Sequence, residues 1–150
     1  MFPCSVSPQI FLIFICPKNI PMTIFSKIIN GEIPCYKIAE DDRFLAFLDV
    51  FPLTRGHVLV IPKAEVDKFY DLDTDTLGGW IQFAQPIAKA IEKAFPCKRV
   101  GISVIGLEVP HAHMHLLPLN TMDDINFTRP KLQLSQEEFS AIREKIVACL

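Results

Sequence analysis

Three histidines alternate with apolar residues in the segment His-Ala-His-Met-His-Leu-Leu, which spans positions 111–117. In an extended strand alternate side chains point to the same face, so the segment predicts a strand with His111, His113 and His115 on one face. A proline on each side suits the two ends of such a strand. The chain has four histidines in all, and the fourth, His57, opens another apolar run. Three titratable rings side by side indicate a functional site, although a single histidine is more often a satisfied or solvent-facing ring.

One chemistry open to this face is metal binding, because neutral imidazole is a common ligand for zinc, copper and iron. Neighbouring side chains on one strand face begin roughly 6.5 to 7 Å apart, at a rise of about 3.3 Å per residue. The rings of His111 and His115 would therefore start far apart around one ion. A zinc site would also favour a further ligand or a nearby carboxylate, for which Glu108 is the candidate. A His-ligated metal hydrolase is one hypothesis, which the spacing does not favour.

The other chemistry is nucleophilic catalysis at phosphorus. A neutral imidazole attacks the phosphorus atom and forms a covalent phosphoramidate-type intermediate, while neighbouring rings stabilise the charge on the phosphoryl oxygens. An ordinary histidine pKa of about 6.5 makes both a neutral nucleophile and a cationic neighbour available near neutral pH. The nucleophile belongs in the middle, with a donor on each side, and this position falls to His113.

The segments around the histidines predict the elements that must hold them in place. Strands are expected at four further segments with alternating or continuous apolar residues: 35–39, 44–48, 57–61 and 99–105. A short N-terminal helix is expected over 23–29, and a C-terminal helix after the capping box at Ser135. A long helix follows the acidic segment 71–75; its apolar stripe includes Ile81, and Pro86 should kink or break it. The predicted fold class is therefore α+β, a mostly antiparallel sheet with one main helix packed on a face.

The composition excludes several classes of protein. The chain has 150 residues, half of them hydrophobic, which is enough for one core. Its 15 basic and 17 acidic residues nearly balance and form no long run of one sign, so neither a nucleic acid nor a membrane surface is the expected partner. The five cysteines are scattered without a C-x-x-C pair, which is typical of free thiols in a reducing compartment and predicts a cytoplasmic protein.

Residues 1–21 differ in composition from the rest of the chain. They hold four of the twelve prolines and an apolar run over 10–16 that is too short to span a bilayer. Neither a basic n-region nor a small-x-small cleavage site accompanies this run, so a signal peptide is not indicated. We expect residues 1–21 to be a poorly ordered extension and residues 22–150 to form a single domain.

The triad segment resembles the signature of the histidine triad (HIT) superfamily of nucleotide hydrolases and transferases, His-φ-His-φ-His-φ-φ with φ hydrophobic. The likeness continues in family order through further segments: 23–34, 40–42, 47–49 and 56–63. This resemblance implies an antiparallel sheet with helices, usually in a homodimer, that binds a nucleoside phosphate without a required metal or other cofactor. A histidine at the third triad position resembles the hydrolase branches rather than the uridylyltransferase branch.

The resemblance also implies a role for each matched residue. His113 matches the nucleophile that forms a nucleotidyl-histidine intermediate, with its other ring nitrogen bonded to the main chain. His115 and His57 match phosphate contacts, and His111 completes the triad. Asp49 matches the carboxylate that binds the ribose hydroxyls, for which a turn-capping role is the alternative. The base pocket, expected to take a purine, is matched by apolar residues that would otherwise indicate ordinary core: Ile24, Phe25, Ile28, Phe47 and Val50.

The stretch before the triad departs from the family pattern. Many members carry an Asn-containing, glycine-rich loop and then Gly-Gln-Ser or Gly-Gln-Thr, whereas this chain is shorter there and has Leu107 and Glu108 in place of the amide and the hydroxyl. Gly106 and Ser103 are the nucleotide-binding candidates of this stretch, with Ser103 standing in for the asparagine. A carboxylate is unfavourable beside a polyphosphate unless it is protonated, but it suits an amine leaving group.

Together, the residues and the resemblance predict a hydrolase that cleaves at the α-phosphate of a nucleoside phosphoramidate or a dinucleoside polyphosphate. The reaction would run through His113 and release a nucleoside monophosphate. One alternative is a nucleotide-binding interaction module with slow or no turnover, which the two replaced residues would favour. The metal hydrolase is the other.

Overall fold

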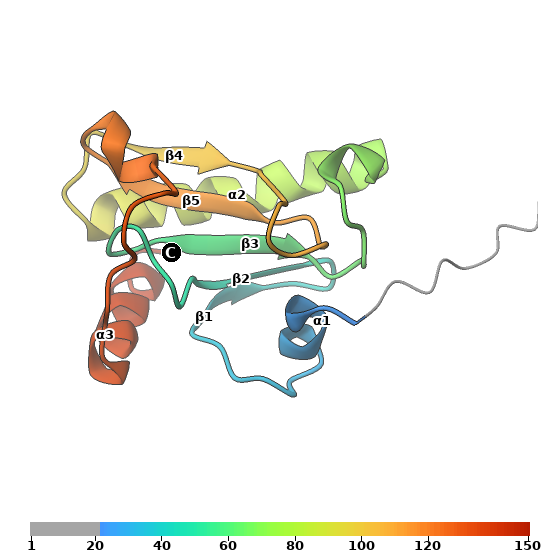
Figure 1. Cartoon of the computed structure of the whole chain (residues 1–150), viewed down its shortest axis with the longest axis horizontal. Helices are drawn as coiled ribbons and strands as arrows, with labels where there is room; N and C mark the ends of the chain where they lie inside the picture. Colours follow the sequence, from blue (N-terminus) through green and yellow to red (C-terminus); the bar gives the residue numbers. More distant parts are fainter. Residues whose placement is uncertain (1–21) are drawn as a thin grey trace, which may run out of the picture.

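The computed structural model describes residues 22–150 (Figure 1), so the extension expected over 1–21 lies outside the described residues. Within residues 22–150 the helices are α1 (Ile24–Ile29), α2 (Thr74–Ala94) and α3 (Gln136–Val147). The strands are β1 (Lys37–Glu40), β2 (Phe44–Leu48), β3 (Val58–Pro62), β4 (Arg99–Ser103) and β5 (Met114–Leu119). Two short 3-10 helices, η1 (Phe69–Asp71) and η2 (Met122–Ile125), complete the chain.

The strands form one antiparallel sheet in the order β1-β2-β3-β5-β4. β5 therefore lies between β3 and β4, with Leu59 and Ser103 as the register partners of His115 on its two sides. α2 packs against β3, β4 and β5, and α3 packs against α2 and β1 (Figure 1). The antiparallel pairs β1–β2 and β4–β5 each join strands that are consecutive in the chain.

Both faces of the central strands are buried, and alternate residues belong to two different cores. Met114 and Leu116 of β5 lie in the larger core, which includes α2 and α3. A smaller core on the other face joins α1 to the sheet: Phe25, Leu45, Phe47, Leu59 and Ile61. His113 and His115 occupy the alternate positions and so face the α1 side. The predicted α+β class, with a main helix on one face of an antiparallel sheet, is confirmed.

The triad segment differs in detail from the predicted strand. β5 begins only at Met114, so His111 and His113 lie in the loop that leads into it. The strand also runs through Pro118, which was expected to close it. β5 pairs with β3 only as far as Leu116, and the missing N–H of Pro118 therefore leaves no gap in that ladder.

α2 is one helix of 21 residues that continues through Pro86, so of the kink or break predicted there the break does not occur. Pro86 lies on the exposed side of the helix, where water can bond the carbonyl group that the proline leaves unpaired. The buried stripe is also narrower than predicted, because Ile81 is 49% exposed. No helix among residues 22–150 is long and apolar enough to cross a membrane.

Gly56 holds the loop before β3 in a left-handed conformation, with φ at +91°. A Cβ atom at this position would lie 2.8 Å from a ring carbon of Phe95. We expect Gly56→Ala to lower the free energy of unfolding by about 2 to 4 kcal/mol, through backbone strain and overpacking, as measured by urea titration. Gly31→Ala is the control, because Gly31 has φ +77° but nothing within 4 Å of its Cβ position, and its strain alone costs about 1 kcal/mol. Equal losses at both positions would contradict the contact with Phe95.

Candidate active site

His111 fixes the start of the triad segment onto the end of β3. Its side chain is fully buried, and its Nε2 atom lies 2.8 Å from the carbonyl oxygen of Pro62. Because a carbonyl oxygen only accepts, Nε2 carries the ring proton, and Nδ1 has no partner among the described residues. Burial lowers the pKa of His111, which keeps the ring neutral at pH 7. The ring also meets that of Phe25 edge to face, at a centroid distance of 5.8 Å.

The orientation of His113 leaves one ring nitrogen free to react. Its Nδ1 atom lies 2.7 Å from the backbone carbonyl oxygen of His111. That oxygen only accepts, so in the neutral ring Nδ1 carries the proton and Nε2 presents a lone pair. The ring of Phe25, 5.2 Å away between centroids, packs against His113 and limits its rotation. This is the main-chain hydrogen bond that the sequence resemblance implied for a nucleophile.

A chain of hydrogen bonds also fixes the protons of His57 and His115. The backbone amide of Leu53 donates to Nδ1 of His57 over 3.2 Å, so a neutral His57 carries its proton on Nε2. Nε2 of His57 lies 2.9 Å from Nδ1 of His115 and donates to it. A neutral His115 therefore carries its own proton on Nε2, as an N–H donor.

Both rings of this pair are neutral at pH 7. Burial, helped by the charge of Lys131, lowers the pKa of His57 to about 3. Burial and the neighbouring His57 and His113 rings lower the pKa of His115 to about 3, against an opposing effect of Asp49. The predicted cationic neighbour beside the nucleophile is therefore wrong. His115 contributes a neutral N–H group.

The hydrogen bonds oppose a further proton for a reason independent of burial. A proton added to Nδ1 of His115 would face the N–H group of His57. If His57 moved its own proton to Nδ1, that proton would face the amide of Leu53, which only donates. Each arrangement sets two donors against each other, so the pair holds two ring protons and resists a third.

Because His57 and His115 are neutral in the folded protein, we expect the free energy of unfolding to fall on acidification. An unfolded histidine titrates near its ordinary pKa of 6.5, whereas His57 and His115 titrate in the folded protein at about 3. Between these values the unfolded chain binds more protons, so the free energy of unfolding falls as the pH drops below about 6.5. We expect a loss of about 2 kcal/mol per histidine between pH 7 and pH 5, measured by urea unfolding. Carboxylates with a lowered pKa, such as Asp73 and Asp124, reduce the free energy of unfolding only near or below pH 3.8, so they do not affect this range. A free energy of unfolding that stays constant from pH 7 to pH 5 would therefore contradict the neutral pair.

A cavity of about 260 Å³, which we call the first cavity, is lined by both His113 and His115. Its wall contains all the residues that the resemblance assigned to the base and the ribose: Ile24, Phe25, Ile28, Phe47, Asp49 and Val50. Sequence reasoning missed other parts of the wall: Ile33, Pro34, Cys35, Phe51, Leu59 and Val109. The first cavity is thus mostly apolar, and Asp49 and Glu108 are the charged residues that line it beside the two imidazoles.

Four predicted site residues lie outside the first cavity. His57 reaches it only through His115, and the His111 side chain is held on β3. Ser103 is the register partner of His115 on β4 but lines no part of the cavity. Gly106 lines a second cavity, which it shares with His113. A direct contact with a bound phosphate is therefore expected of His115, with His57 in support.

Asp49 caps a turn and also lines the first cavity. Its Oδ1 atom accepts from the backbone amide of Phe51 over 2.9 Å, which caps the turn after β2. Its Oδ2 atom lies 3.6 Å from Nε2 of His57. The carboxylate is mostly buried and lines the first cavity, so its remaining lone pairs can accept hydrogen bonds from a ligand.

Phe127 covers the imidazole pair, and it lies in a segment without a hydrophobic period. Its ring lies 4.8 Å from that of His115 and 6.5 Å from that of His57, between centroids, edge to face in both cases. Lys131 donates to the Phe127 carbonyl oxygen over 2.9 Å, which places its charge near the same pair.

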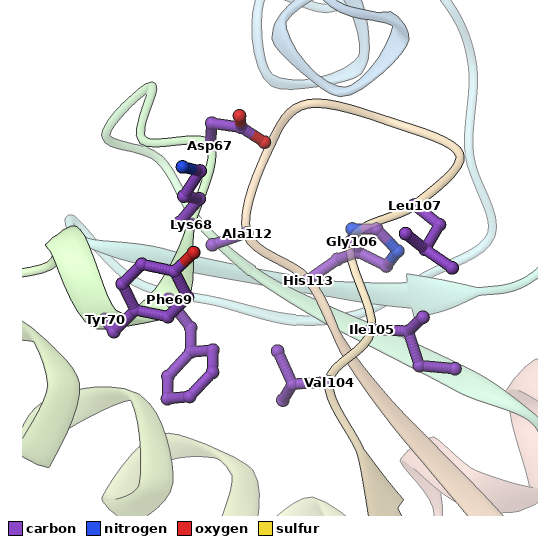
Figure 2. A pocket seen from close by; sticks show the side chains of 10 residues that line it. All are labelled: Asp67, Lys68, Phe69, Tyr70, Val104, Ile105, Gly106, Leu107, Ala112 and His113. Carbon is purple, nitrogen blue, oxygen red and sulfur yellow. The ribbon is translucent and has the colours of Figure 1, made fainter.

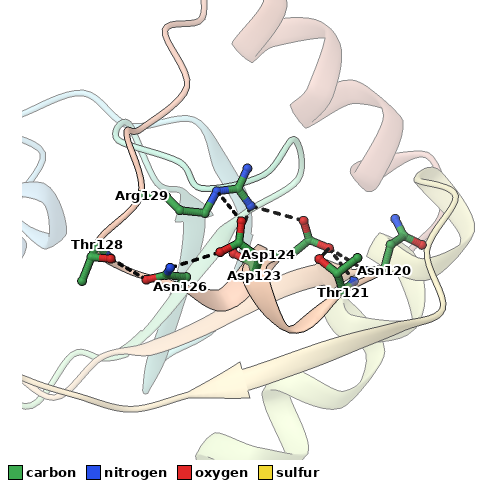
Figure 3. A network of polar contacts seen from close by, with 7 residues as sticks. All are labelled: Asn120, Thr121, Asp123, Asp124, Asn126, Thr128 and Arg129. Carbon is green, nitrogen blue, oxygen red and sulfur yellow. Dashed lines mark hydrogen bonds and ion pairs between the residues drawn. The ribbon is translucent and has the colours of Figure 1, made fainter.

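A polar network fixes the loop that carries Phe127 (Figure 3). The Asp124 carboxylate accepts from the backbone amides of Asn120 and Thr121, each over 2.8 Å. Arg129 pairs with Asp124 over 3.4 Å and with its neighbour Asp123 over 3.3 Å. The network holds the chain on both sides of the aromatic residue, so the cover over the imidazole pair is part of the folded structure.

Removing this cover should change the titration of His115. We expect Phe127→Ala to raise the pKa of His115 from about 3 toward 6.5, because water then reaches the ring. The measurement is the pH titration of the His115 ring protons by NMR. Phe127→Leu is the matched control, since it keeps an apolar cover and should keep the low pKa. An unchanged pKa in Phe127→Ala would show that Phe127 does not shield the pair.

Asp49, His57 and His115 are the described residues that come closest to a metal site. Each offers one ligand atom, and these atoms lie within 4.8 Å of one another. To bind a metal, Nε2 of His57 must give up its proton, which then moves to Nδ1 against the amide of Leu53. The residues therefore do not fit a metal centre without a change in this hydrogen bond.

Comparison with known proteins agrees with this fold. The family model described as HIT domain matches residues 30–122, and the chain belongs to the HIT family. An adenosine 5'-monophosphoramidase of Schizosaccharomyces pombe is 34% identical over 125 residues, which cover 82% of this chain and 94% of the relative.

Solved structures of HIT proteins share the fold. A HIT-like protein involved in cell-cycle regulation from Bartonella henselae superposes with a TM-score of 0.74 at 34% identity, covering 85% of this chain and 96% of that protein. A zinc-bound histidine triad family protein from Mycobacterium smegmatis superposes with a TM-score of 0.70 at 29% identity, covering 84% and 91%.

Proposed function

We propose that this protein is a nucleotide hydrolase that cleaves at the α-phosphate of a nucleoside phosphoramidate or a dinucleoside polyphosphate. The reaction passes through a nucleotidyl group bound covalently to His113 and releases a nucleoside monophosphate. The substrate carries a purine, which the apolar wall of the first cavity holds. No metal or other cofactor takes part in this mechanism.

The observation that carries the proposal is the hydrogen bond from Nδ1 of His113 to the His111 carbonyl oxygen, 2.7 Å long. In the neutral ring it fixes the tautomer in which Nε2 carries no proton and presents a nucleophilic lone pair. This nitrogen belongs to a ring that lines the first cavity. The relative from Schizosaccharomyces pombe, named as an adenosine 5'-monophosphoramidase, supports the same class of reaction.

The reaction has two displacement steps. Nε2 of His113 attacks the α-phosphorus atom, and the new N–P bond forms as the bond to the leaving group breaks. The Nε2 proton of His115 forms a hydrogen bond with a phosphoryl oxygen and stabilises the charge that develops there. Asp49 accepts hydrogen bonds from the ribose hydroxyls. Water then attacks the same phosphorus atom, and the N–P bond breaks to restore His113.

A homodimer in the cytoplasm is part of this proposal. β4 is an edge strand of the sheet, and its Ile102 is 53% exposed, which supports pairing with a second copy along this edge. Analytical ultracentrifugation tests it: a protein that sediments as a monomer at micromolar concentration would contradict the dimer. The unpaired thiols of Cys35, Cys97 and Cys149 are in keeping with a reducing compartment.

Mass spectrometry of the intact protein tests the covalent step. The protein is mixed with an adenosine phosphoramidate or a diadenosine polyphosphate, and the reaction is stopped in alkaline denaturant after a short interval. We expect an added mass of one adenylyl group. Bound nucleotide without an adduct or turnover would instead support an interaction module. Stoichiometric zinc, with activity lost on chelation, would support the metal hydrolase.

A further inference from the structure

Two cavities meet at His113. The second cavity, of about 230 Å³, is shown in Figure 2. The loop before β5 divides it from the first cavity, because Gly106 and Leu107 line the second whereas Glu108 and Val109 line the first. His113 is the one residue that the two linings share. A molecule that reacts at His113 can therefore place one of its two parts in each cavity.

The wall of the second cavity is mainly apolar and aromatic. η1 contributes Phe69 and Tyr70, and the segment after β4 contributes Val104, Ile105 and Leu107. Figure 2 shows the two aromatic rings on one side of the cavity and Ile105 and Leu107 on the other. Leu107 is 88% exposed and Tyr70 is 65% exposed, although large apolar side chains gain free energy when they are covered. Such a wall suits an apolar or aromatic group.

The charges around the second cavity do not suit a chain of phosphates. Its charged lining residues are Asp67 and Lys68, whose charges cancel, and the ammonium group of Lys68 lies 5.7 Å from the centre of the Tyr70 ring. Glu108 adds a negative charge across the dividing loop, and His115 is neutral. Phosphate chains are held by several cationic groups, which these linings do not supply.

We propose that the second cavity binds the leaving group of the substrate, and that this group is a primary amine with an aromatic or branched apolar body. The inference rests on the proposed function and names its substrate class. The P–N bond of the phosphoramidate breaks as the bond from phosphorus to Nε2 of His113 forms. The departing nitrogen keeps the electron pair and takes a proton from solvent, so the products are a free amine and nucleotidyl-His113. Leu107, the most exposed apolar side chain of this wall, is the side chain that selects the apolar body.

Paired substrates test the choice of leaving group. Adenosine 5'-phosphoramidates of 3-phenylpropylamine and of ethylamine release amines of similar basicity, so their kcat/KM values differ mainly through binding of the body. We expect the wild-type protein to prefer the phenylpropyl compound by at least about tenfold. Leu107→Ser should reduce this ratio severalfold. Leu150→Ser, at an exposed apolar residue of the C-terminus, should leave the ratio unchanged.

The outcomes separate this inference from the proposed function. Equal kcat/KM values for the two compounds, with an adenylyl adduct on His113, would overturn the leaving-group cavity and leave the hydrolase intact. Faster turnover of diadenosine tetraphosphate than of the phenylpropyl compound would overturn the amine class. The absence of an adduct with every substrate would overturn both. An unchanged ratio in Leu107→Ser would remove Leu107 as the selecting residue.

Discussion

Replacing His113 by alanine is expected to abolish the adenylyl adduct and to lower kcat for an adenosine phosphoramidate by about 10⁴-fold or more. The variant loses the unprotonated Nε2 atom, and the other rings do not replace it. His115 carries a proton on its Nε2 atom, and His111 bonds Pro62 through its own. The measurements are single-turnover kinetics and intact mass.

A second variant separates lost chemistry from lost structure. His113→Asn places an amide N–H group near the position of the imidazole Nδ1, so it can still donate to the carbonyl oxygen of His111. We expect this variant to keep its melting temperature and its affinity for adenosine monophosphate while it loses the adduct. Turnover near the wild-type rate in His113→Asn would contradict His113 as the nucleophile.

The second large effect is expected at the imidazole pair. His115→Ala removes the N–H donor proposed for the phosphoryl oxygen and should lower kcat by about 10²- to 10³-fold, with little change in KM. His57→Ala should cost less, because His57 acts through the orientation of His115 and lies outside the first cavity.

A double-mutant cycle measures that dependence. If His57 contributes only by orienting His115, the double variant should be no slower than His115→Ala alone. Single-turnover rates for the two single variants and the double variant give the answer directly. If the fold loss in rate of the double variant equals the product of the two single losses, His57 contacts the substrate independently.

Much of the fold could be predicted because the central strands of the sheet are buried on both faces. The continuous apolar runs of β2 and β3 follow from this burial, and the alternation in 111–117 separates core residues from site residues. The residues assigned to the first cavity came from the resemblance, because an apolar wall cannot be told from ordinary core by pattern. Pro118 does not end its strand, and Pro86 does not break its helix. Local sequence rules do not include where strand pairing stops or which side of a helix faces water.

The main-chain hydrogen bond of His113 was implied by the resemblance, but the other polar surroundings of the histidines could not be predicted from the sequence. The donor that orders the imidazole pair is the main-chain amide of Leu53. A backbone amide is present in nearly every residue type, so the sequence does not indicate this donor. Phe127 lies beyond the matched family region, 30–122, in a loop without hydrophobic period. The second cavity joins η1 to the segment after β4, two parts of the chain brought together only by the tertiary fold.

The amide of Leu53 has one more consequence, for proton conduction. Protons hop along a row of imidazoles only if the group at the far end can supply or take up a proton, and a backbone amide does neither. If His115 released its Nε2 proton and drew another from His57, His57 would be left with none. No proton can therefore enter or leave this row at Nδ1 of His57. The departing amine must be protonated from the solvent side of the cavities, and the ring proton of His57 should exchange slowly with water.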